Sequence, residues 1–260
     1  MSLDDFLDPY EFKARMIPSV ITLLPLLWTV YFFCPKVVTD PFLFAGSGLI
    51  ALALVYLCGM ILKDMGTRYA NRFWAQAGGA PSTRMGRMRD SYFSIEQKRR
   101  IHSAVRAHFS IELLSFIEEL ENPELADRRI ADAFREVKAW LRHAGHATLV
   151  DKHNAEYGAT RNLCGARALV AGFAIVGSVV CGFKGGISTP INTGSLVNLS
   201  ILLLWLPLGW SILPAMLRVN ANNYAESAWM SFLAMAQRAE KKPSVSLRDA
   251  TTVGERRGNF

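Results

Sequence analysis

The chain has 260 residues, a mass of 28.9 kDa and a formal net charge of +7, and 51% of its residues are hydrophobic. The hydrophobic residues gather in four long blocks that are separated by polar stretches. This distribution excludes a disordered chain, a fibrous repeat and a small disulfide-stapled domain, and it is untypical of a soluble globule.

Each hydrophobic block is long enough to cross a membrane as a helix. A bilayer core of about 30 Å needs roughly 20 helical residues, and in lipid a lone helix satisfies its own backbone. The expected spans are residues 17–34, 42–62, 163–183 and 196–217. They carry no charge except Arg167, near the start of the third span, although Pro18 and Pro25 interrupt the first. Buried helices of a large soluble fold are the alternative, but such helices usually carry a polar stripe.

The basic residues predict the orientation of the spans. The connections within the first and the second pair of spans hold one basic residue each, Lys36 and Lys184, while region 63–162 is rich in Lys and Arg. The positive-inside rule therefore predicts that region 63–162 and both termini are cytosolic. The lipid bilayer and its anionic headgroups are the expected partners of these basic residues.

The first span is not expected to be a cleavable signal peptide. Acidic residues precede it, and no small-residue cleavage pattern follows it. Asp8 and Pro9 instead suit the start of a short interfacial helix.

These observations predict an all-α integral membrane protein in which two transmembrane hairpins flank a cytosolic helical insert. The expected segments are 1–62 with the interfacial helix and first hairpin, 63–162 with the insert, 163–217 with the second hairpin, and 218–260 with a cytosolic helix and a flexible tail.

Two amphipathic helices are expected in the insert. Ser94 suits an N-cap, with Gln97 completing a capping box, and Asn122-Pro123 suits the end of this helix and the start of the next. The first helix carries apolar or aromatic residues on a helical period, at Ile101, Val105, His108, Leu113, Ile117 and Leu120. The second carries a stripe of Ile130, Phe134, Val137 and Leu141 and ends at Gly145.

Small residues recur at helical spacing in two spans, in one stripe of the second span and two stripes of the third. These stripes are Ser47, Ala51 and Gly59; Ala168 and Gly172; and Ala174, Ser178 and Gly182. They predict close helix packing within the bundle, or else the interface of a homo-oligomer or pore. The spans lack Asp, Glu, Lys and His, which disfavours a transporter.

A first distinctive string combines a glycine-rich turn with arginines. It lies within residues 63–106, the part of the insert whose own net charge is +7. It reads Gly78-Gly79-Ala80-Pro81-Ser82-Thr83-Arg84, followed by Arg87 and Asp90. Its backbone N–H groups could cradle an anion, although the alternative is a plain turn and the string is not a P-loop. A nucleic-acid partner is not expected, because no nucleic-acid motif accompanies the basic residues.

A second string leads into the third span and includes Asn154, Tyr157, Gly158, Arg161 and Asn162, with Gly165 just after it. Its residues suit the headgroup level or a helix boundary. The candidate ligand- or partner-binding residues are therefore Gly78, Gly79, Pro81, Thr83, Arg84, Arg87, Asp90, Asn154, Tyr157, Arg161 and Asn162.

No catalytic constellation, metal site or cofactor motif is found in the sequence. His143, His146 and His153 lack the His-Glu-x-x-His pattern of a zinc helix, and Gly145 interrupts them. The acidic run Glu118, Glu119, Glu121 and Glu124 is typical of a solvated helix end. We therefore expect no enzyme, no metal and no cofactor.

The two strings, with the stretch from Lys98 to His102, resemble those of uncharacterised bacterial four-span membrane proteins over roughly residues 70–165. The resemblance implies a bacterial inner-membrane protein, with no settled activity. Some bacterial proteins of this general layout act in phage defence by permeabilising the membrane, which is an analogy of layout.

Three hypotheses follow from the sequence. The first is a defence or stress effector whose insert senses a ligand or a cytosolic protein partner and whose spans form a homo-oligomer or perturb the membrane. The second is a passive anchor or scaffold for a cytosolic partner. The third, a membrane enzyme, requires a carboxylate or histidine cluster at the cytosolic face.

Overall fold

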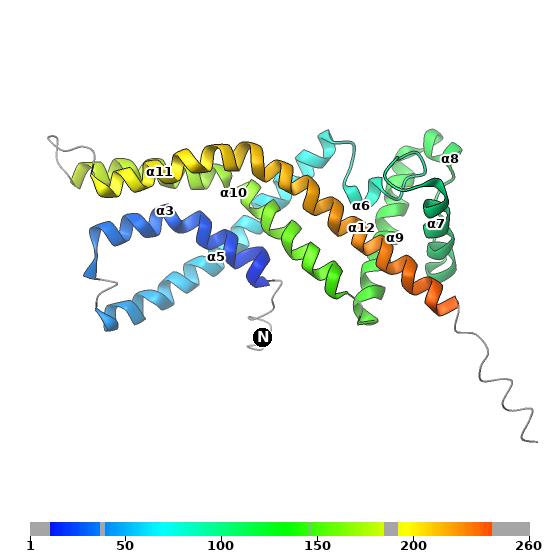
Figure 1. The fold of residues 1–260 in the computed structure, drawn as a ribbon, viewed down its shortest axis with the longest axis horizontal. Helices are drawn as coiled ribbons and strands as arrows, with labels where there is room; N and C mark the ends of the chain where they lie inside the picture. Colours follow the sequence, from blue (N-terminus) through cyan, green and yellow to red (C-terminus); the bar gives the residue numbers. More distant parts are fainter. Residues whose placement is uncertain (1–10, 37–39, 146, 185–191, 241–260) are drawn as a thin grey trace, which may run out of the picture. The chain divides into compact units, whose positions relative to one another are not determined.

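The computed structural model describes residues 11–36, 40–145, 147–184 and 192–240, and all regular structure in these residues is helical (Figure 1). Four helical stretches are long and apolar enough to cross a membrane: Phe12–Phe33, Gly46–Gln76, Thr148–Lys184 and Thr193–Arg238. Each contains most or all of one expected span. The prediction of an all-α, four-span membrane protein is therefore confirmed.

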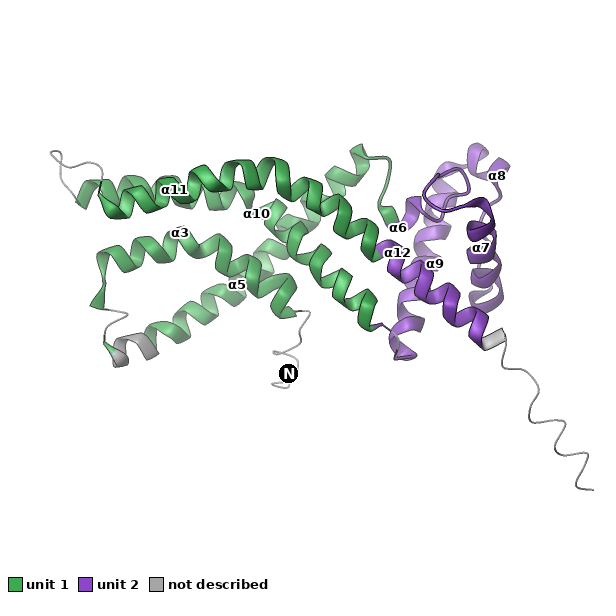
Figure 2. Ribbon diagram, viewed as in Figure 1, with its two compact units in different colours: residues 1–81, 148–224 green, residues 82–147, 225–260 purple. Residues whose placement is uncertain are grey.

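The chain divides into two compact units (Figure 2). The first, which we call the spanning unit, comprises Met1–Pro81 and Thr148–Tyr224, and the second, the helical unit, comprises Ser82–Ala147 and Ala225–Phe260. The two ends of the expected insert therefore belong with the spans. The expected cap at Asp8 and Pro9 and the tail after Glu240 lie outside the described residues.

The spanning unit is organised around α10. Its elements are η1 (Phe12–Met16), α3 (Ile17–Phe33), α5 (Pro41–Gln76), α10 (Thr148–Lys184), α11 (Thr193–Pro207), η2 (Leu208–Ile212) and the first part of α12 (Leu213–Glu240). Helix α10 packs against α3, α5 and α11. Its 37 residues rise about 55 Å, well beyond a hydrocarbon core of about 30 Å, so part of α10 projects outside the membrane.

The prolines of the first span do not break α3. The hydroxyl groups of Thr22 and Thr29 donate to the carbonyl oxygens of Pro18 and Pro25 over 2.7 and 2.8 Å. These bonds give both hydroxyl protons an acceptor within the apolar helix itself.

Glycines set the closest approach between α5 and α10. A Cβ added to Gly165 would lie 2.5 Å from the backbone nitrogen of Gly66. Of the predicted small-residue stripes, Gly59 packs closely, with an added Cβ 3.2 Å from Ser19 Oγ, whereas a Cβ on Gly172 would meet no atom within 4 Å. Only part of the predicted pattern thus serves packing within the described chain.

The helical unit is built from short helices around an aromatic core. Its elements are α6 (Pro81–Arg84, of which Pro81 belongs to the spanning unit), α7 (Ile95–Phe109), α8 (Phe116–Glu121), α9 (Pro123–His143) and the end of α12. The ring of Phe232 stacks on Phe109 with centroids 5.4 Å apart, and Trp229 packs on Phe134 at 5.3 Å. The predicted apolar stripe of α9 is buried, which confirms that helix.

The first predicted helix of the insert is wrong in its length. Ser94 caps α7 as predicted, but the Gln97 side chain donates to Met230 Sδ and does not complete the capping box. The helix ends at Phe109 because Ser110 adopts a left-handed conformation with φ 56°. Ser115 then starts α8 with a capping box of its own, which separates Ile117 and Leu120 from the stripe of α7.

Candidate functional site

The glycine pair of the first string closes α5. Gly78 and Gly79 have φ values of 80° and 113°, which side chains larger than hydrogen disfavour. The amide of Gly79 donates to the carbonyl oxygen of Trp74 over 2.8 Å. This bond uses a Gly79 N–H that an anion cradle would need, and Pro81 follows at the start of α6.

The arginines of the first string are bound to carboxylates of their own unit. Arg84 Nε lies 3.2 Å from Asp90 Oδ2. Arg87 makes a bidentate pair with Asp127, at 2.6 Å from Nε and 2.7 Å from an Nη. Bidentate pairs of this kind are strong and directional. Both charges therefore stabilise the fold of the helical unit, and a ligand would have to displace a carboxylate to reach them.

Two buried charged side chains hold the segment between Arg87 and Asp90. Glu119 is 1% exposed, and its carboxylate accepts from the amides of Met88 and Arg89 over 2.8 and 3.3 Å. Lys98, 2% exposed, donates to the carbonyl oxygens of Met88 and Asp90. We call residues 86–90 the clamped loop. The prediction that the whole acidic run is solvated is wrong at Glu119.

His102 holds the start of the clamped loop. Its Nε2 lies 2.8 Å from the carbonyl oxygen of Gly86. Burial lowers the pKa of His102, because the charged imidazolium loses its hydration there; the bond to Gly86 opposes the shift. A neutral His102 that donates to Gly86 fits this environment.

The second string lies within α10, and its aromatic member packs against two other helices of the spanning unit. Trp74 Nε1 donates to the hydroxyl of Tyr157 over 3.3 Å. The rings of Tyr157 and Tyr224 are parallel within 5°, with centroids 6.0 Å apart. Arg161 lies over the same Tyr157 ring at 5.8 Å. These contacts tie α10 to α5 and α12.

The end of the second string lies where α10 packs closely against η1 and α5. Asn162 is 1% exposed, and its amide donates to the carbonyl oxygen of Ala14 over 2.7 Å. A Cβ on Gly66 would lie 2.6 Å from Asn162 Oδ1. Asn162 and Gly165 therefore fix how α10 meets η1 and α5.

Arg167, the charged residue of the third span, lies among aromatic rings. Its guanidinium carbon is 4.8 Å from the ring centroid of Tyr69 and 5.3 Å from that of Trp210. Trp205 Nε1 donates to the carbonyl oxygen of Arg167 over 2.9 Å. A guanidinium over aromatic faces is stabilised by cation–π attraction, which suits the edge of an apolar layer.

Neutral polar groups meet between α3, α10 and α11. Asn198 is 0% exposed, and its amide donates to Thr29 Oγ1 over 3.1 Å and to the carbonyl oxygen of Gly194 over 3.2 Å. The hydroxyls of Ser178 and Ser195 bond to each other's backbone oxygens. We call these side chains the polar junction. They face neighbouring helices and bond within the bundle.

The predicted site residues form separate structures. Gly78, Gly79, Pro81, Asn154, Tyr157, Arg161 and Asn162 belong to the spanning unit, whereas Thr83, Arg84, Arg87 and Asp90 belong to the helical unit. Within the latter, Arg84 pairs with Asp90. Residues that the sequence analysis missed are Glu119 and the partner of Arg87, Asp127.

Within the described residues, no three His, Cys, Asp or Glu side chains are grouped to hold a metal ion. His143 and His153 bond to Ala139 and Glu156 respectively, and His146 lies outside the described residues. Comparisons with models of protein families, with curated proteins and with solved structures find no match to this chain.

Proposed function

We propose that the chain is a multi-pass anchor of the bacterial inner membrane that presents its helical unit to a basic, partly apolar protein partner in the cytosol. The four apolar helices support the anchor, and the scarcity of Lys and Arg in the short connections supports cytosolic termini. The described spans place no Asp, Glu, Lys or His in their apolar centres, which favours an anchor over an ion path.

The observation that carries the proposal is the inverted burial of α8. Its carboxylate Glu119 is buried, whereas the apolar side chains of Phe116, Ile117 and Leu120 are 49%, 68% and 56% exposed. Large apolar side chains that are exposed together on one surface mark an interaction site, whereas single exposed apolar residues are common on any protein.

The charge beside this surface selects the class of partner. Glu118 and Glu121 on the same helix are exposed. Anionic lipid headgroups would be repelled by these carboxylates, whereas a protein surface with Lys or Arg around an apolar centre complements them. We therefore propose that the α8 surface, formed by Phe116, Ile117 and Leu120, binds a protein and not the bilayer.

Photo-crosslinking in cells tests this assignment. A crosslinking residue replaces Ile117 in the full chain, and the control replaces Arg128, an exposed residue of α9. We expect the residue at position 117 to crosslink to one protein. The purified form of that protein should bind the purified wild-type chain and should not bind the E118R/E121R variant of the chain. Adducts to lipid alone, adducts to a second copy, or binding that charge reversal leaves unchanged would each contradict the proposal.

A second candidate is an effector that assembles into a homo-oligomer and perturbs the membrane. It is favoured by one face of α10, where Ala168 is exposed and Gly172 has open space beside it. Helices can approach closely at such positions. If this holds, induced expression dissipates the membrane potential and Gly172→Leu restores it at equal protein level. An unchanged potential in cells that express the wild-type chain rejects this candidate.

A further inference from the structure

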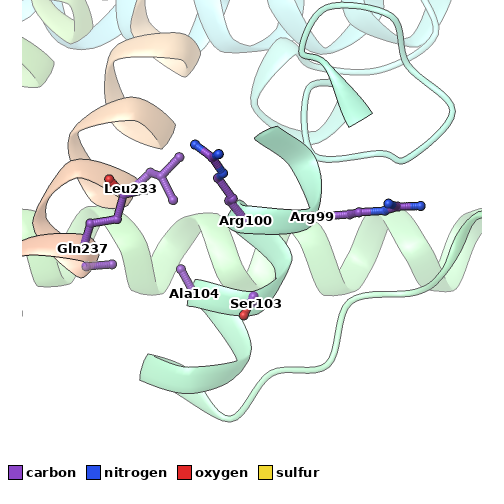
Figure 3. A pocket seen from close by; sticks show the side chains of 7 residues that line it. Arg99, Arg100, Ser103, Ala104, Leu233 and Gln237 are labelled. Carbon is purple, nitrogen blue, oxygen red and sulfur yellow. The ribbon is translucent and has the colours of Figure 1, made fainter. Parts of the chain in front are cut away.

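An open groove of about 280 Å³ lies between α7 and α12 in the helical unit (Figure 3). It is lined by Arg99, Arg100, Ser103, Ala104, Leu233, Ala236 and Gln237. Apolar side chains that are themselves buried, Ala104, Leu233 and Ala236, form part of the lining, and polar side chains stand at its exposed edges. The groove belongs neither to the clamped loop nor to the α8 surface.

The arginines of this groove differ from those of the first string. Arg84 and Arg87 each have a carboxylate partner, whereas no carboxylate of the described residues pairs with Arg99 or Arg100. Lys98, their neighbour in sequence, is turned inward to the clamped loop. The groove thus offers uncompensated positive charge beside an apolar wall.

The two arginines are not equivalent. Figure 3 shows Arg100 extending on the side of α7 that faces Leu233, whereas Arg99 extends away from that residue. A guanidinium presents five N–H donors in a planar fork, and the Ser103 hydroxyl and Gln237 amide add further donors at the edges. A tetrahedral anion with several acceptor oxygens can use more of these donors than a carboxylate can.

We propose that this groove binds a small phosphate ester, with Arg100 on the phosphate and the apolar wall against a short carbon segment of the ligand. The volume lies near the lower limit of small-molecule sites, about 300 Å³, which restricts the ligand to a headgroup-sized compound. Both a free phosphate ester and the phosphoglycerol headgroup of a lipid have this chemistry. The inference is independent of the proposed docking function, because no residue of α8 takes part.

Chemical protection tests the site in the full chain and separates the two sources. Phenylglyoxal modifies accessible arginines, and peptide mass spectrometry measures the rate at each one. The probes are glycerol phosphate added to protein in neutral detergent, and vesicles of phosphatidylcholine with or without phosphatidylglycerol that contain the protein. Sodium chloride of equal ionic strength is the control for screening, and Arg128 is the internal reference.

We expect a probe to slow modification of Arg100 about tenfold, as a charged hydrogen-bonded contact provides, and to leave Arg99 and Arg128 nearly unchanged. Protection by glycerol phosphate identifies a soluble ester, and protection only by phosphatidylglycerol identifies a lipid; both support the site. Absence of protection by either probe, or equal protection of all three arginines, overturns it.

A matched pair of variants removes the same charge from adjacent positions. Titration with glycerol phosphate, or with phosphatidylglycerol if that probe protects, should show about tenfold weaker binding by Arg100→Gln and little change by Arg99→Gln. Both side chains are exposed, so both variants should melt at the wild-type temperature. Equal loss in the two variants would show that net charge alone attracts the probe, and would overturn the proposal.

Discussion

The spanning unit and the helical unit both contain buried polar side chains, but the hydrogen bonds that hold these side chains differ in charge. In the spanning unit the buried partners are neutral: Asn162 bonds to the backbone of Ala14, and Asn198 bonds to Thr29. In the helical unit Glu119 and Lys98 are buried with their charges and hold the clamped loop by its amides and carbonyl oxygens.

This difference follows from what surrounds each unit. A charge in a lipid-facing bundle cannot recover the hydration it loses, so neutral amides and hydroxyls are the less costly groups there. A unit in water can compensate a buried charge with several directed hydrogen bonds. The comparison teaches that the spanning unit depends on backbone proximity, whereas the helical unit depends on hydrogen bonds that compensate its buried charges.

The largest effect is expected from Gly165→Ala, because its new Cβ would lie 2.5 Å from the Gly66 nitrogen and backbone cannot move aside. We expect a loss of at least about 3 kcal/mol and an aggregated elution profile in detergent. Gly172→Ala is the matched control, since its Cβ meets no atom within 4 Å. Equal behaviour of the two variants would contradict the proposed close contact of α5 and α10.

Glu119→Ala should destabilise the helical unit by about 2–3 kcal/mol, because two buried amides of the clamped loop lose the carboxylate that accepts from them. Limited proteolysis of the full chain should then cut within residues 86–90. Glu121→Ala removes the same charge from an exposed site of α8 and should leave the cleavage pattern unchanged. Cleavage that is no faster in Glu119→Ala than in Glu121→Ala would show that the clamp is dispensable.

Asn198→Ala removes the centre of the polar junction and should lower the free energy of unfolding of the spanning unit by about 1 kcal/mol. The effect is modest because partners also exist in the unfolded chain within the membrane. Ser200→Ala, on the same helix, removes only a bond to its own α11 backbone and serves as control. Unfolding in detergent, followed by intrinsic fluorescence, measures both; a stabilised Asn198→Ala would show that the junction serves something other than stability.

The smallest effect is the pH dependence contributed by His102. Burial lowers the pKa of His102 in the folded chain below its ordinary value of 6.5. At a pH between the folded-state and the unfolded-state pKa, the unfolded chain therefore holds more protons than the folded chain. Stability should therefore fall as the pH drops below about 6.5. In His102→Gln the melting temperature should change less with pH over this range. In His143→Gln, a variant at an exposed site, the melting temperature should change with pH as in the wild type. An unchanged slope in His102→Gln would assign the dependence to other groups.

Local signals in the sequence predict much of the fold. Uninterrupted apolar length predicts the four spans, because only helix length and apolarity are needed to cross a bilayer. Ser94, Asn122 and Gly145 mark helix ends where the structure has them, because caps act within a few residues. The break after Phe109 was missed, although Ser115 and Glu118 form a capping-box pattern that could have predicted the start of α8.

The candidate site is less predictable from sequence. The pairs that determine it join distant residues: Gly66 with Gly165, and Arg87 with Asp127. No local spacing encodes such a pair, so arginines that are paired in the fold cannot be told from arginines such as Arg100 that are not. The inward turn of Glu119 was missed for the same reason, since its partners are the backbone amides of a loop about thirty residues away.

The contact of Gly66 with Gly165 also restricts how the spanning unit can move. Sliding α10 along α5 by one residue would push a side chain into the opposing backbone, so piston-like shifts are blocked at this height. Rotation about the contact leaves the two glycines in place, and a helix of 37 residues amplifies a small rotation at its ends. A motion of α10 against α5 that keeps this contact is therefore a tilt around it and not a shift along it.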